Sequence, residues 1–400
     1  MKLNCLNRLS HVLLAGLLAG TALPGFMPEA NAQLSFVFTN RPSQALPRRP
    51  GIILIVADGL GYGDLSCYGQ TQFQTPNLDQ LAAGGIRFTN YSAGDAASSP
   101  ARAALLLGRN ADHLRRSAAG NVTLTGGDVT VEQLLRQSGY HTGLIGEWDL
   151  GDENSAGAPW KKGFDEFAGD LASDEATNYY ADYMWRYAPR SILTTNNLQE
   201  DFVGKEMLYP NTGGQHGQYI PDLLTKATLN FVKNNQPDQF NRYRPFFLLL
   251  DYTIPGTGSG PVPTDAPYSE EPWPQPQKNK AAMISRLDSY VGQLQQQLQG
   301  LGLTNDVVIF FTSDTGPQKG GGVDLNFFHS ITASNSLRVP MIVSWPGKVP
   351  AGQVSAYAWT ASDFLPTAMD IALTKAPADI DGRSVLPTLL GQTQTNRQNF

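Results

Sequence analysis

Five short runs of apolar residues constrain the fold of this 400-residue chain more than any other feature. They occupy residues 52–57, 142–146, 246–250, 307–312 and 339–345. Apolar runs that are continuous rather than alternating are typical of strands buried on both faces of a parallel sheet. Stretches with helical spacing or helix-stop signals separate them, at residues 75–83, 130–138, 221–234 and 281–299. The alternation predicts an α/β fold with a mostly parallel central sheet and helices on both faces.

Acidic residues follow the first four of these runs. They are Asp58, Glu147, Asp251 and Asp314. Ligands of open α/β sheets gather at the carboxyl ends of the strands, so these side chains are expected at one crevice. Any one of them alone is typical of a solvated turn, but four together predict a shared site.

A serine, a proline and an arginine form the pattern S-x-P-x-R at Ser98, Pro100 and Arg102, just before an apolar run. The pattern predicts a helix start that presents a hydroxyl and a guanidinium. Helix N-termini and arginine side chains both favour anions. The alternative is a plain helix cap with Pro100 in the first turn.

The composition and the N-terminal residues predict the cellular location of the protein and exclude some partners. Residues 1–32 combine basic residues, an apolar run and small residues before a predicted cleavage after Ala32, as in a secretory signal. We therefore expect a secreted or periplasmic protein with no transmembrane segment, a retained N-terminal anchor being the weaker alternative. Only Cys67 would survive cleavage, so no internal disulfide is expected. A net charge of −6 without a basic block argues against nucleic acid as a partner.

The domain layout follows from the same patterns. We expect a flexible lead-in at residues 33–50, one catalytic-fold domain at residues 51–391 and a tail at residues 392–400. Residues 151–216 and 256–277 lack clear periodicity and are predicted to be irregular segments that rim the site.

These motifs resemble those of the sulfatase family, in the alkaline phosphatase superfamily. Residues 58–64 and 312–317 are similar to the family's two metal-binding turns, and the likeness continues in order to about residue 391. It implies a sulfatase-like α/β fold and hydrolysis of a sulfate ester of a glycan or small molecule. In the family the first residue of the S-x-P-x-R motif is oxidised to formylglycine, the nucleophile. The resemblance therefore implies that Ser98 is modified and that Arg102 holds it together with the sulfate.

The resemblance also implies a calcium ion, with ligands at Asp58, Gly59, Asp314 and Thr315. Gly59 stands where the family has a second aspartate, and Thr315 where it usually has asparagine. Because calcium takes six to eight oxygen ligands, the site is expected to be weakened or lost. The chain stops about where the family's small C-terminal subdomain begins, so that subdomain is expected to be absent or truncated.

Four further positions depart from the family pattern. Glu147 and Asp149 replace a lysine and a histidine, Gly256 replaces a second histidine, and His329 stands near a later lysine. Two unit charges in contact near a protein surface interact by about 4 kcal/mol, so Glu147 would repel a sulfate that lysine would attract. His329 either donates a hydrogen bond to an anion or has no chemical role.

Several functions remain open at this point. The first is a sulfatase of weakened or altered activity. The second is a catalytically inactive pseudo-sulfatase that binds an extracytoplasmic glycan or partner. A phosphoryl-transfer enzyme with unmodified Ser98 ranks last, because no base or good metal site supports it. Separately, Glu147 and Asp149 could join Asp58 and Asp314 in an acidic pocket for a divalent cation, which ranks below loss of the metal.

Overall fold

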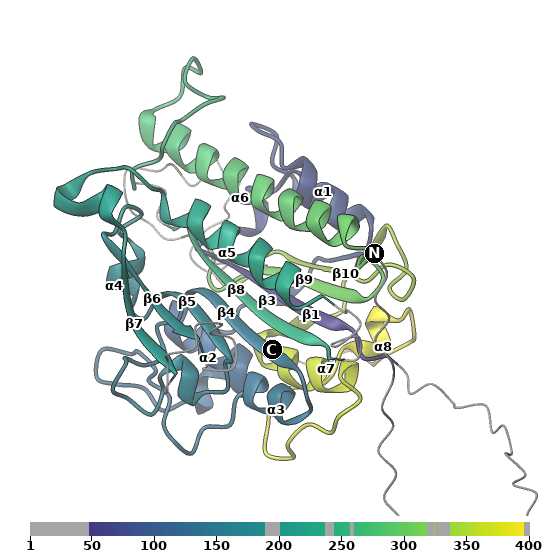
Figure 1. The fold of residues 1–400 in the computed structure, drawn as a ribbon. Coiled ribbons are helices and arrows are strands. Elements are labelled where there is room, and N and C mark those ends of the chain that lie inside the picture. Colours follow the sequence, from purple (N-terminus) through teal and green to yellow (C-terminus); the bar gives the residue numbers. More distant parts are fainter. Residues whose placement is uncertain are drawn as a thin grey trace, which may run out of the picture. The chain divides into compact units, whose positions relative to one another are not determined.

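Five parallel strands form the centre of the sheet in this computed structural model, which describes residues 48–188, 201–236, 244–256, 260–317, 324 and 337–395. β1 lies between β9 and β8, and β4 and β5 follow on the β8 side (Figure 1). Their bounds are Gly51–Asp58 for β1, His141–Glu147 for β4, Glu166–Asp170 for β5, Phe246–Pro255 for β8 and Val307–Ser313 for β9. The first four apolar runs are thus confirmed as central strands, and the predicted fold class is confirmed.

Five further strands extend this centre on both sides to a sheet of ten strands, through antiparallel pairs except for the parallel pair of β11 with β2. On one side lie β10 (Met341–Ser344), β2 (Ile86–Phe88) and β11 (Gln353–Ser355). On the other side lie β6 (Tyr183–Ala188) and β7 (Phe202–Met207). The fifth apolar run is a buried strand, as predicted, but β10 runs antiparallel to β9. The apolar run predicted burial, and burial alone does not encode strand direction.

Residues 151–216 correct a second expectation. Predicted to be irregular, they contain β5, β6, β7 and the short helix α4 (Ser173–Ala176). β6 pairs with β5 and with β7, so its order comes from neighbours on both sides rather than from its own sequence pattern. Two short strands, β3 (Tyr91–Ser92) and β12 (Trp359–Thr360), pair separately.

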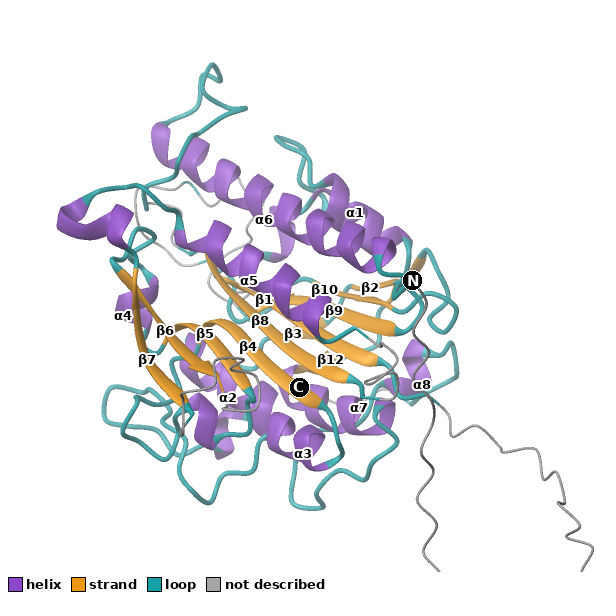
Figure 2. Ribbon diagram, viewed as in Figure 1, coloured by secondary structure: helices purple, strands orange, loops and turns teal. Residues whose placement is uncertain are grey.

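Helices cover both faces of the sheet (Figure 2). α1, α5 and α6 lie on one face, and α2, α3 and α7 on the other. Along β1, Ile52, Leu54 and Val56 pack toward the α2 face, while the residues between them pack toward the α6 face. The helix bounds are Pro76–Ala83 for α1, Ser98–Leu107 for α2, Val131–Gln137 for α3, Ile220–Asn234 for α5, Gln275–Gly300 for α6, Phe364–Ile371 for α7 and Leu386–Leu389 for α8.

Candidate active site

Helix α2 carries Ser98 and Arg102 to the carboxyl ends of the central strands. Ser98 is the first helical residue and Arg102 follows one turn later, so the two side chains leave the same face of the helix. Ala97, not Ser98, is the N-cap residue, and no side chain caps this helix. Ser98 is partly exposed, whereas Arg102 retains only 5 % of its exposure. Ser98 is therefore the more accessible of the two residues, and Arg102 is buried.

Backbone hydrogen bonds tie the ends of β1, β8 and β9 together beneath this helix. The amide of Gly256 donates to the carbonyl of Asp58 at 2.9 Å, and the amide of Asp314 donates to that of Ala57 at 3.0 Å. Gly59 and Gly256 have φ values of +64° and +55°, and a Cβ on Gly59 would lie 3.1 Å from the carbonyl oxygen of Gly256. This close approach favours glycine at both positions.

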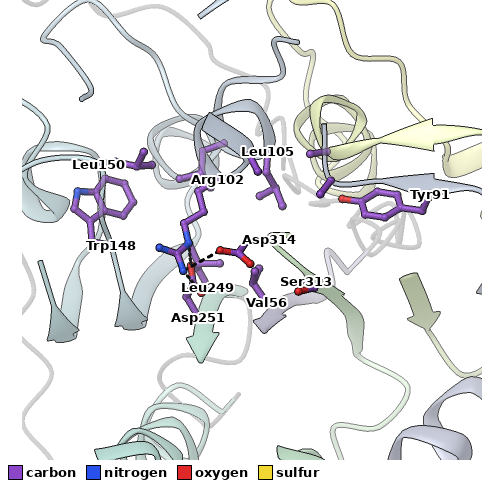
Figure 3. A pocket seen from close by; sticks show the side chains of 14 residues that line it. Val56, Tyr91, Arg102, Leu105, Trp148, Leu150, Leu249, Asp251, Ser313 and Asp314 are labelled. Atoms are coloured by element: carbon purple, nitrogen blue, oxygen red, sulfur yellow. Dashed lines mark hydrogen bonds and ion pairs between the residues drawn. The ribbon is translucent and has the colours of Figure 1, made fainter. Parts of the chain in front are cut away.

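Three carboxylates surround the guanidinium of Arg102 (Figure 3 shows two of them). Glu147 Oε2 accepts a hydrogen bond from Nη2 at 2.8 Å, and Glu147 Oε1 lies 2.7 Å from Nη1 as an ion pair. Asp251 Oδ2 lies 3.0 Å from Nε, and Asp314 Oδ2 lies 3.2 Å from Nη2. All four side chains are at most 5 % exposed. Every nitrogen of the guanidinium thus faces a carboxylate of the protein itself.

More carboxyl groups than basic side chains are described in the crevice, and the pKa values of several of these carboxyl groups are raised. Burial, followed by the charges of Asp314 and Glu147, raises the pKa of Asp58 well above its usual range. Burial also raises the pKa of Asp251 well above its usual range, although Arg102 opposes the shift. For Asp149, burial raises the pKa to about 6. Burial works against the charge on Arg102, but Asp251, Glu147 and Asp314 together raise its pKa.

The residues predicted to hold calcium do not fit that role in this arrangement. Asp314 uses Oδ1 to accept hydrogen bonds from the amide of Gly59 at 3.1 Å and the hydroxyl of Thr315 at 3.2 Å, and its Oδ2 faces Arg102. Gly59 supplies no side-chain oxygen, and Glu147 has turned both of its oxygens to Arg102. Across the described ranges, no group of three or more His, Cys, Asp or Glu side chains is arranged to hold a metal ion.

A small cavity adjoins Arg102 on the α2 face of the sheet (Figure 3). Its volume is about 10 Å³, roughly the smallest space that admits one water molecule. Apolar side chains form most of its wall, including Val56, Leu105 and Trp148. This void is far smaller than a ligand pocket and leaves the ion pairs in an apolar setting.

Most of the residues singled out from the sequence come together at this crevice. Asp251 also reaches Arg102, but from within β8, because that strand continues to Pro255 instead of ending at residue 250. His329 lies outside the described residues. The residues brought together there are Asp58, Gly59, Arg102, Glu147, Asp149, Asp251, Gly256, Asp314 and Thr315. Ser98 lies one helical turn before Arg102.

Tyr179 is a neighbour of the crevice that sequence reasoning did not single out. Its hydroxyl donates to the carbonyl of Thr253 at 3.2 Å. It also lies 2.8 Å from the place where a Cβ on Gly256 would stand. No local motif marks this tyrosine. It comes from the segment at residues 151–216, and only the folded chain brings it next to β8.

Comparison with known proteins agrees with the fold and the motifs. A family model described as Sulfatase matches residues 50–374. The chain belongs to the sulfatase family. It is 31 % identical to human arylsulfatase A over 372 residues, which cover 89 % of this chain and 71 % of that protein. It is 30 % identical to N-acetylgalactosamine-6-sulfatase of Canis lupus familiaris over 380 residues, 88 % of this chain and 68 % of the relative.

Solved structures show the same sulfatase fold. The crystal structure of Ps i-CgsB in complex with k-i-k-neocarrahexaose matches with a TM-score of 0.68 and 29 % identity, covering 86 % of this chain and 77 % of the other. Within the part of the chain that the structure describes, no helix is both long and apolar enough to cross a membrane.

Proposed function

We propose that this sulfatase-family protein is an exported sulfate-ester hydrolase whose activity is severely weakened relative to its relatives. One observation carries the proposal: the two carboxylate oxygens of Glu147 lie 2.7 Å and 2.8 Å from guanidinium nitrogens of Arg102. The arginine that would hold a sulfate is already neutralised by a carboxylate of the same chain. Removing one preorganised charge from such a site commonly costs about a hundredfold in rate, and here the charge is reversed.

Residues of this chain would each have a role in the remaining activity. Ser98, matured to formylglycine, would supply the nucleophile from the start of α2. Arg102 would orient it from one helical turn away. Asp58, Asp314 and Thr315 are the remaining matches to the calcium ligands, but the present hydrogen bonds of Asp314 and Thr315 do not favour an ion. The substrate would be a sulfate ester of a glycan or small molecule, as the names of the relatives indicate for those proteins.

Turnover of an aryl sulfate tests this proposal, with human arylsulfatase A as the reference and Ser98→Ala as the matched inactive control. We expect turnover at least about a hundredfold below the reference but above Ser98→Ala. Mass spectrometry of the Ser98 peptide, from protein made in its native host, should show a residue lighter by two hydrogens. Turnover equal to the reference would contradict the weakened site.

A non-catalytic role is the second candidate, and the ion pairs of Arg102 also favour it. A pseudo-sulfatase would keep the fold and bind an extracytoplasmic glycan or partner through the same crevice. An unmodified Ser98, together with turnover identical to that of Ser98→Ala, would decide for this role.

Export is part of the proposal. The N-terminal 32 residues lie outside the described residues, so the argument rests on their basic, apolar and small-residue pattern. N-terminal sequencing of the mature protein should begin at Gln33. A chain recovered from the cytoplasm with residue 1 intact would refute export.

A further inference from the structure

We infer that the guanidinium of Arg102 is the resident cation of this crevice, in place of a divalent metal ion. The fold and the crevice would then be independent of calcium. This inference does not depend on the modification of Ser98 or on any turnover. It concerns which positive charge balances the buried acids.

The first argument is the count of charges. Three carboxylates contact the guanidinium of Arg102, those of Glu147, Asp251 and Asp314, and Asp58 lies at the end of β1 beside β8. Buried carboxylates need a cation or a proton to balance them. Arg102 is the cation in contact with Glu147, Asp251 and Asp314.

The second argument is geometric. A guanidinium presents five N–H donors in a rigid plane, so it can bridge several carboxylates as a metal ion does. Arg102 lies 2.7 Å from Glu147, 3.0 Å from Asp251 and 3.2 Å from Asp314, and these residues come from three different strands or strand ends. The arginine therefore bridges carboxylates of three strands or strand ends, as a metal ion bound to the same carboxylates would.

The third argument is the state of the oxygens that an ion would need. Both oxygens of Glu147 lie within ion-pair distance of Arg102. In Asp314, Oδ1 accepts hydrogen bonds from the Gly59 amide and the Thr315 hydroxyl, and Oδ2 makes no hydrogen bond with a described residue but lies 3.2 Å from Arg102 Nη2. Calcium needs six to eight oxygens, and magnesium usually keeps several waters. The cavity of about 10 Å³ beside the guanidinium leaves no room for a hydrated ion.

Thermal unfolding of four proteins tests the inference: the parent, Arg102→Met, Arg102→Lys and the surface control Arg186→Met. Arg186 also pairs with a glutamate, but both side chains are 48 % exposed. Each protein is heated in EDTA and in about 10 mM CaCl₂, well above the dissociation constants of weak calcium sites. Calorimetric titration of the parent with CaCl₂ accompanies the scans.

We expect the melting temperature of the parent and of Arg186→Met to differ by less than about 1 °C between EDTA and calcium. Arg102→Met keeps a long apolar stem but leaves the carboxylates unbalanced. Its melting temperature should fall by roughly 5–10 °C in EDTA and recover partly in calcium. Arg102→Lys keeps the charge and should remain insensitive to calcium.

Two results would overturn the inference. One is saturable calcium binding by the parent with a dissociation constant below about 1 mM, because the crevice would then hold an ion beside Arg102. The other is an Arg102→Met protein that folds and loses stability without any response to calcium. If Arg102→Met fails to fold, the titration of the parent and the scan of Arg102→Lys still decide. Neither result bears on aryl sulfate turnover, so failure here is separable from failure of the proposed function.

Discussion

Glu147 lies at the end of β4 with 3 % of its surface exposed, and both of its oxygens face Arg102. A buried ion pair of this kind is costly to break, because removing one partner leaves the other charge uncompensated. The identity of this one residue therefore decides whether Arg102 is free for an external anion. Glu147 and an external anion such as sulfate would therefore compete for the guanidinium of Arg102, and the outcome decides what the crevice can bind.

Release of Arg102 is testable at the same scale. Glu147→Gln removes the charge and keeps the shape, so the guanidinium should bind inorganic sulfate about tenfold or more tightly than in the parent. Calorimetric titration with sulfate measures the change. The control is Glu206→Gln, which removes an exposed glutamate from an ion pair with Arg186. Equal sulfate affinity in the parent and Glu147→Gln would show that Glu147 does not block the arginine.

A second buried acid makes stability depend on pH. Glu132 in α3 is 0 % exposed, and burial raises its pKa from 4.5 to about 8. The folded protein then holds this proton while the unfolded chain releases it, so stability falls as pH rises from about 4.5 to about 8 and is constant above.

Glu132→Gln removes this dependence. The variant should gain stability over the parent as pH rises through this window, by on the order of 4 kcal/mol at its upper end. Urea unfolding at several pH values measures the difference, with Glu153→Gln on the surface as control. A constant difference between parent and variant from pH 5 to pH 8 would contradict the buried, protonated glutamate.

At the scale of the element, two glycines let neighbouring strands approach closely at the site. Gly146 in β4 has φ +119°, and a Cβ there would lie 1.7 Å from the carbonyl oxygen of Asp251 in β8. Gly169 in β5 would bring a Cβ to 1.9 Å from the carbonyl oxygen of Gly146. Gly146 directly precedes Glu147, so the same backbone conformation helps to aim that carboxylate at Arg102.

Gly146→Ala should therefore destabilise the protein by at least about 3 kcal/mol, since it combines backbone strain with a clash against backbone. Gly69→Ala is the matched control, because Gly69 has φ +109° but open space within 4 Å of its Cβ position. It should cost only about 1–2 kcal/mol. Denaturant unfolding compares the two. Equal losses would show that strain alone, and not the close strand approach, explains Gly146.

At the scale of the whole molecule, one sheet separates two apolar cores. Ile52 and Leu54 alternate with Ile53 and Ile55 along β1, so this strand contributes to both cores at once. β7, at the edge of the sheet, is different, because Phe202, Val203 and Met207 are each at least 40 % exposed. The stability of the fold is thus concentrated in the centre of the sheet.

Hydrogen exchange should follow this gradient. Amides of β1, β8 and β9 should open only with global unfolding and exchange at least about 10³-fold more slowly than those of β7. Mass spectrometry of peptides from each strand measures the rates. Equal protection of β7 would mean that another chain or segment pairs with its outer edge.

The sequence by itself determined the family, the fold class and four of the central strands, because each is encoded locally, in motifs and short buried runs. It also brought the acids to one crevice, since parallel strands end at the same edge of a sheet. Only the tertiary structure decided that β10 runs antiparallel, that β5, β6 and β7 extend the sheet, and that Glu147, Asp251 and Asp314 share one arginine. Those outcomes depend on contacts between segments distant in the chain. Which strands pair and which charges meet is decided only when these segments pack together.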